Sequence, residues 1–104
     1  MKTAHMALIA ASIAVTSSAQ AKIRMVKNTC PFPADVALKV VGLNNEMDGV
    51  AAEYAWLRSD RPGWKVIQQY LAKDRGKVFD GMLIMKDGAR QTLCFDITDF
   101  FGKY

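Results

Sequence analysis

The spacing of apolar residues along the chain changes its period near the middle. Over 46–59 the apolar positions recur at steps of three and four residues, which predicts an amphipathic helix; the stripe consists of Met47, Val50, Ala51, Tyr54 and Leu57. Asn45 is suited to cap the start of this helix, and Pro62 with Gly63 ends it. We therefore expect one helix whose apolar stripe covers a sheet.

Beyond Gly63 the apolar residues alternate with a period of two, which predicts strands. Asp87-Gly88 is a strong signal for a two-residue hairpin turn, here between strands at 78–86 and 89–97. A further strand is expected at 64–72. The earlier β-branched segment VALKVVGL at 36–43 also predicts a strand, although its pairing partner stays open.

The hairpin register divides the side chains between two sheet faces. With a four-residue loop at 73–76, the face toward the helix collects Val78, Met82, Ile84, Leu93, Phe95, Ile97, Ile67 and Leu71. The opposite face collects Trp64, Val66, Tyr70, Phe79, Leu83, Met85 and Cys94. This second face is too apolar to be left in water, so we expect another segment or a partner to cover it.

The first segment able to cover that face is an extended arm at 22–35. Pro31 and Pro33 exclude a helix there and disfavour a central strand. The two cysteines, Cys30 and Cys94, predict a disulfide that draws the arm across the sheet, and Gly81 opposite Cys94 leaves room for the crossing. A redox-active thiol pair is the alternative, but the chain has no Cys-x-x-Cys motif.

The first 21 residues have the features of a secretory signal peptide. Lys2 precedes an apolar run at 6–15, and Ala19-Gln20-Ala21 forms a cleavage site. A retained membrane anchor would need a longer run. We expect a periplasmic or secreted protein with no membrane span after cleavage, consisting of the arm at 22–35 and one domain at 36–104.

Composition excludes most catalytic chemistry. The only histidine, His5, leaves with the leader, so no Ser-His or Cys-His pair remains, and the spacing of the cysteines matches no metal site. There is no phosphate-binding glycine loop, and the charges are interspersed, so no cofactor, metal or nucleic acid is expected. Carboxylate chemistry is what remains, with Glu46, Asp48, Glu53 and several Asp residues as candidates.

The order of a helix, a Pro-Gly break and hairpin-linked strands resembles the small exported PepSY-like domains and the related repeats of β-lactamase-inhibitor proteins. The resemblance covers roughly 46–98 and rests on Tyr54-Ala55-Trp56-Leu57, Arg61-Pro62-Gly63, Lys86-Asp87-Gly88 and Phe95-Asp96. It implies a module without catalytic activity that binds or inhibits an exported hydrolase through its sheet. The arm and the ending DFFGKY depart from the pattern.

We therefore predict an α+β fold with one helix on a small antiparallel sheet of three to four strands and an extended N-terminal arm. The predicted function is binding of another exported protein, or of a second copy, without catalysis; the predicted partner-binding residues are Trp56, Trp64, Tyr70, Phe79, Leu83 and Met85. The alternatives are a carboxylate-dependent hydrolase and a carrier of a small apolar ligand. Trp56 either packs against the arm or the strand at 36–43 or faces solvent as a contact residue, and Phe100 with Phe101 either closes the core or extends the contact surface.

Overall fold

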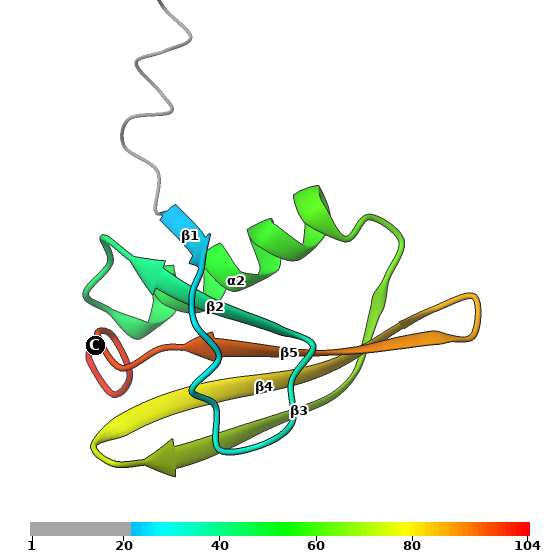
Figure 1. The fold of residues 1–104 in the computed structure, drawn as a ribbon. Coiled ribbons are helices and arrows are strands. Elements are labelled where there is room, and N and C mark those ends of the chain that lie inside the picture. Colours follow the sequence, from blue (N-terminus) through cyan, green and yellow to red (C-terminus); the bar gives the residue numbers. More distant parts are fainter. Residues whose placement is uncertain (1–21) are drawn as a thin grey trace, which may run out of the picture.

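One helix lies across one face of a five-stranded sheet in the computed structural model, which describes residues 22–104 (Figure 1). The predicted signal peptide at 1–21 lies outside the described residues. The elements are β1 (Lys22–Met25), β2 (Val36–Val41), α2 (Glu46–Asp60), β3 (Lys65–Asp74), β4 (Lys77–Lys86) and β5 (Ala89–Asp96). Within 22–104 the only helix is too short and too polar to cross a membrane. The predicted α+β class is confirmed.

The sheet is larger than predicted and is mixed, with the order β1-β2-β5-β4-β3. The expected three to four antiparallel strands become five, because the start of the arm forms β1 against β2, and β2 runs parallel to β5. Asp35 fixes this parallel register: its backbone N–H donates to the Thr92 carbonyl (2.8 Å), and its Oδ2 accepts from the Thr92 N–H (2.7 Å). Because β2 and β5 are far apart in the sequence, no turn signal could predict that they pair.

The hairpin between β4 and β5 has the predicted turn and register. Lys86 faces Ala89 and Gly81 faces Cys94. Asp87 and Gly88 both have positive φ (50° and 83°), as a tight two-residue turn between twisted strands requires. The local turn signal therefore sets the register of the two central hairpin strands.

The turn between β3 and β4 has two residues, not the four that the sequence predicted. Strand β3 continues to Asp74, opposite Lys77, and only Arg75 and Gly76 form the turn, with φ of 53° and 79°. The shortening moves the pairing by two residues, which leaves each side chain on its predicted face. The register shift between Val66 and Gln68 reverses the faces of the β3 residues that precede it. Trp64 and Val66 pack against the helix-side core instead of the opposite face, and Ile67 is 53% exposed instead of buried.

The helix begins and ends close to its predicted bounds but buries a different stripe. Asn45 caps it, its side chain accepting from the Asp48 N–H (2.9 Å). Of the predicted stripe only Leu57 is buried, and Met47 is 81% exposed. The helix instead docks through Gly49, Glu53 and Leu57. A Cβ at position 49 would overlap the Phe100 ring, so this glycine lets the helix approach the C-terminal turn closely.

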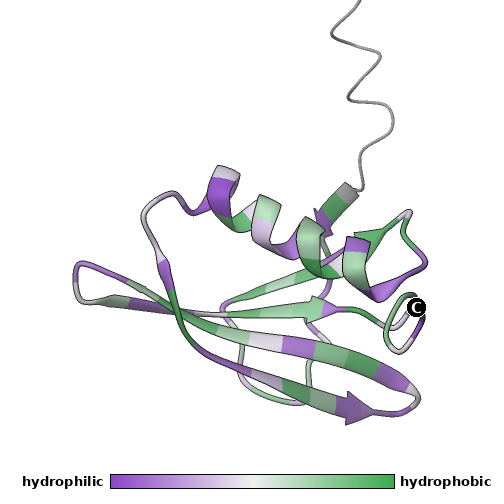
Figure 2. Cartoon of the chain, turned by 180° about the vertical axis from the view of Figure 1, so that it is seen from behind, coloured by the Kyte–Doolittle hydropathy of each residue, from purple (hydrophilic) through white to green (hydrophobic). Residues whose placement is uncertain are grey.

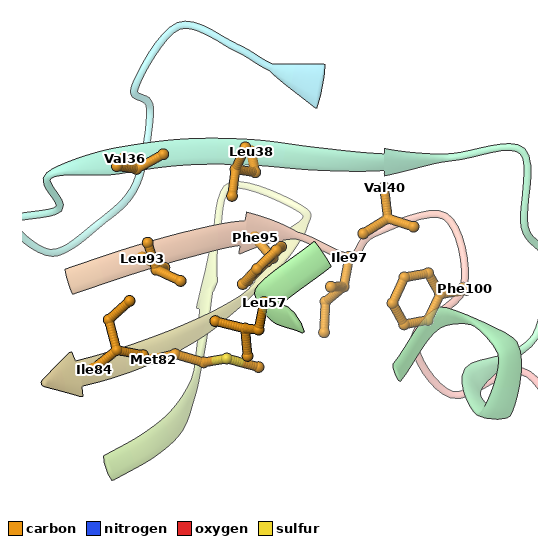
Figure 3. Close-up of a cluster of buried hydrophobic side chains, with 10 residues drawn as sticks. All are labelled: Val36, Leu38, Val40, Leu57, Met82, Ile84, Leu93, Phe95, Ile97 and Phe100. Carbon is orange, nitrogen blue, oxygen red and sulfur yellow. The ribbon is translucent and has the colours of Figure 1, made fainter. Parts of the chain in front are cut away.

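The core lies between the helix and the middle of the sheet. Figure 2 shows that hydrophobic residues predominate along the central strands. Its fully packed members, drawn in Figure 3, are Val36, Leu38, Val40, Leu57, Met82, Ile84, Leu93, Phe95, Ile97 and Phe100. The predicted helix-side residues of β4 and β5 are all in or against this cluster. Phe100 closes the core, which confirms one of its two predicted roles.

Candidate functional sites

The predicted arm covers the central part of the second sheet face. The disulfide between Cys30 and Cys94 is present. Phe32 packs edge-on against Tyr70, with ring centroids 5.0 Å apart. A Cβ on Gly81 would lie 2.6 Å from the Tyr70 ring and 3.0 Å from Phe32, so the glycine provides the predicted space for the crossing. The disulfide agrees with an oxidising compartment outside the cytoplasm.

The six residues predicted to bind a partner do not form one surface. Phe79 is buried, Tyr70 lies under Phe32, and Leu83 and Met85 are half-buried on the same face. Trp56 is half-buried on the other side of the sheet, edge-on to Phe95 with ring centroids 5.9 Å apart. Trp56 therefore packs against β5 and is not solvent-facing, and its role in binding stays a prediction.

Trp64 lies in a groove where the helix ends and β3 begins. The groove has a volume of about 670 Å³. Its apolar lining comes from Tyr54, Leu57, Trp64 and Val66, and its basic lining from Arg58, Arg61 and Lys65. Arg58 and Lys65 are exposed, whereas the Arg61 guanidinium lies 5.0 Å from the Trp56 ring centroid and donates to Gln91 (2.7 Å). We call this the Trp64 groove.

The strand that forms one wall of the Trp64 groove is at an edge of the sheet. Among the described strands β3 pairs only with β4, so the N–H and C=O groups along its other side are free. Ile67 and Leu71 are 53% and 50% exposed on it. A long edge strand with exposed apolar side chains offers a pairing surface to another extended chain.

A second site is a pair of carboxyl groups buried between α2 and β4. Glu53, on the helix, is 1% exposed, and Asp80, on β4, is 7% exposed. The Gln69 side-chain amide donates to both carboxyl oxygens of Asp80 (3.0 and 3.3 Å). The Tyr54 hydroxyl in turn donates to the Gln69 carbonyl oxygen (2.9 Å), which fixes the orientation of the amide. These four residues form a connected polar cluster that extends from the buried carboxyl pair to the exposed Gln69.

The carboxyl pair holds a proton at neutral pH. Burial, and then the hydrogen bond and the charge of Asp80, raise the pKa of Glu53 to about 10. Burial also raises the pKa of Asp80, although hydrogen bonds from Glu53 and Gln69 oppose this. Glu53 is therefore the neutral acid that donates to the Asp80 carboxylate, because two adjacent carboxylates would repel each other strongly.

The carboxyl pair lines a pocket of about 160 Å³. The other lining residues are Glu46, Val50, Gln69, Leu71, Ile97, Phe100 and Phe101. Glu53 Oε2 is buried and has no hydrogen-bond partner among residues 22–104. Val50 and Leu71 are exposed, so the pocket reaches the surface. We call this the carboxyl pocket.

Sequence reasoning included Glu53 among its carboxylate candidates but did not single out Asp80. A signal was available: Asp80 alternates with Val78 and Met82, so the confirmed hairpin register places it on the helix side of the sheet. Glu53 is four residues from both Gly49 and Leu57, the other buried positions of the helix. An acid on each facing layer would have indicated a buried pair.

No cluster of three or more metal-ligating side chains occurs within 22–104. Comparison with models of protein families, with curated proteins and with solved structures gave no match to this chain. The resemblance to PepSY-like domains therefore stays a prediction.

Proposed function

We propose that this chain is a non-catalytic module of the periplasm or the secreted space, and that it binds an extended acidic segment of another exported protein in the Trp64 groove. The observation that carries the proposal is the position of the groove, which adjoins the free edge of β3. An extended segment can pair with the free backbone groups of the strand while its side chains enter the groove.

The chemistry of the groove favours an acidic partner with apolar side chains. Trp64 and Val66 offer apolar area, and a half-buried tryptophan provides a large contact at little ordering cost. Arg58 and Lys65 place positive charge beside it. Neither makes a salt bridge within the described residues. Complementary charge would speed the encounter and select against basic segments.

A carboxylate-dependent hydrolase is the second candidate, because Glu53 and Asp80 are a neutral acid and a carboxylate in contact, as such chemistry requires. Their burial argues against it. A general acid must reach the leaving group to within hydrogen-bond distance, and only a group small enough to enter about 160 Å³ can do so here. Assays with polysaccharide and peptide substrates, repeated with Asp80→Asn, would test this candidate.

Affinity capture tests the binding proposal, with the disulfide-bonded protein as bait and an envelope extract of the host as the source of partners. Four baits are compared: wild type, Trp64→Ala, the double variant R58E/K65E, and Arg75→Glu as a charge-reversal control at the distant β3–β4 turn. The double variant keeps the proposal testable if Trp64→Ala is unstable, because Arg58 and Lys65 are exposed.

The expected result is a protein that wild type and Arg75→Glu capture and that Trp64→Ala and R58E/K65E lose. The same captured protein should slow hydrogen exchange at the β3 amides. Capture that is equal with wild type and the double variant, or exchange protection outside β3 and the end of α2, would exclude the Trp64 groove as the binding site.

A further inference from the structure

The carboxyl pocket has one acceptor atom that the fold leaves without a partner. Glu53 is 1% exposed, and its Oε2 makes no hydrogen bond to the described residues. A buried polar atom without a hydrogen-bond partner is energetically unfavourable, because it has lost its hydration without compensation. Such an atom at the wall of a pocket that reaches the surface indicates that a ligand supplies the missing hydrogen bond.

The charged residues around the carboxyl pocket indicate the charge of that ligand. The lining includes three acidic residues, Glu46, Glu53 and Asp80, and no basic one. Glu46 already accepts from the Gly102 N–H (2.8 Å), and Gln69 occupies one side of Asp80. A donor-rich positive group therefore finds two carboxyl groups facing it, at Glu53 and Asp80.

The remaining lining defines the rest of the ligand. Val50, Leu71, Ile97, Phe100 and Phe101 are apolar and surround the carboxyl pair. The volume of about 160 Å³ has room for about five heavy atoms if each takes the share of a water molecule, about 30 Å³. A metal ion would need more polar ligands than this pocket offers, and the described residues provide no cluster of three.

We propose that the carboxyl pocket binds an alkylammonium group, with the nitrogen donating to Glu53 Oε2 and to Asp80 and the short alkyl chain lying against Leu71, Phe100 and Phe101. An ammonium group has three donors and no acceptor, which matches a pair of carboxyl groups. The group can come from a free amine or from a lysine side chain of a protein. This pocket is separate from the Trp64 groove, and the proposal is independent of the function proposed there.

The probe is n-butylammonium chloride, titrated into the disulfide-bonded protein and followed by amide and side-chain NH shifts. The expected result is a saturable shift at the Gln69 side chain and at the Leu71 amide, with little effect of the neutral n-butanol. Nα-acetyl-lysine methylamide is the second probe: binding tighter than that of the free amine identifies a lysine side chain, and weaker binding identifies a free amine, both in agreement with the proposal.

Variants distinguish binding by the carboxyl pair from nonspecific attraction to acidic residues elsewhere on the protein. Asp80→Asn should weaken n-butylammonium binding by about tenfold or more, as expected for a lost charge-assisted hydrogen bond. Glu53→Gln replaces a neutral acid by an amide that keeps an oxygen acceptor, so it should bind n-butylammonium nearly as well as the wild type. Asp87→Asn removes an equal charge at the β4–β5 turn and should have no effect. The proposal is overturned by the absence of a saturable shift, by equal binding of n-butanol, or by unchanged binding in Asp80→Asn.

Discussion

Replacing Glu53 by glutamine should make the protein more stable at neutral pH. The side chain carries a proton in the native state, where its pKa is about 10 against an ordinary value of 4.5, and loses it on unfolding. The unfolded chain therefore binds fewer protons than the native one between these two values. Stability is then greatest below pH 4.5 and falls as pH rises.

The size of the effect follows from the width of this pH window. Each pH unit between the two pKa values costs about 1.4 kcal/mol, so the free energy of unfolding of the wild type should fall by about 3 kcal/mol from pH 5 to pH 7. Glutamine has nearly the same shape as the neutral acid, can donate to Asp80, and does not titrate. Glu53→Gln should match the wild type near pH 4.5 and exceed it by about 3 kcal/mol at pH 7.

The assay is denaturation by urea, followed by tryptophan fluorescence, at pH 5, 6, 7 and 8 with the disulfide intact. Asp87→Asn, at an exposed turn, is the control and should keep the wild-type slope. Because burial also raises the pKa of Asp80, a smaller slope just above the ordinary range of an aspartate should survive in Glu53→Gln. A wild-type free energy that is flat from pH 5 to pH 8, or an equal slope in Glu53→Gln, would refute the assignment of a proton to this pair.

Three further substitutions test the packing. Gly49→Ala should destabilise the protein by about 1–3 kcal/mol despite the better helix propensity of alanine, because the new Cβ overlaps Phe100. The double variant C30S/C94S should lose about 4 kcal/mol, since the disulfide closes a loop with a sequence separation of 64. Gly81→Ala should displace the arm while leaving the helix-side core in place, which faster hydrogen exchange confined to residues 26–35 would show.

Each packing prediction has a contrary outcome. For position 49, the matched control is Ala55→Gly on the exposed side of the helix, which should cost about 1 kcal/mol through propensity alone; a stabilised Gly49→Ala would mean that the helix does not rest on Phe100. An unchanged midpoint of urea denaturation after loss of the disulfide would show that this cross-link does not stabilise the fold. Uniform exchange after Gly81→Ala would show that arm and core unfold together.

The local parts of this fold follow from the sequence, because local signals determine them. Asn45 caps the helix at the position that the sequence predicted, and Asp87-Gly88 sets the register of β4 and β5. The pairing of β2 with β5 does not follow, since the two strands are far apart in the chain and no turn connects them. The bulge between Val66 and Gln68 was enough to misplace Trp64, because one extra residue moves the side chains before it to the other face, whereas the two-residue error in the β3–β4 turn left the faces unchanged.

The candidate sites likewise depend partly on patterns within one element, which the sequence reveals, and partly on contacts between distant elements, which it does not. An apolar stripe is a reliable guide to a buried helix face only when apolar contacts hold the helix in place. Here a glycine against Phe100 and a carboxyl pair hold it, so the buried face shares only Leu57 with the predicted stripe. The spacing within each element places Glu53 and Asp80 on facing layers, but how the helix lies on the sheet, and so whether the two carboxyl groups meet, does not follow from either spacing.

The central position of β5 has a consequence for the order in which the molecule can assemble. This strand lies between β2 and β4, yet all other described strands precede it in the chain. A growing polypeptide can therefore form only two separate hairpin-like pieces, β1 with β2 and β3 with β4, until residues 89–96 arrive and join them. Cys94 lies on the same strand, so the covalent cross-link also waits for this final step.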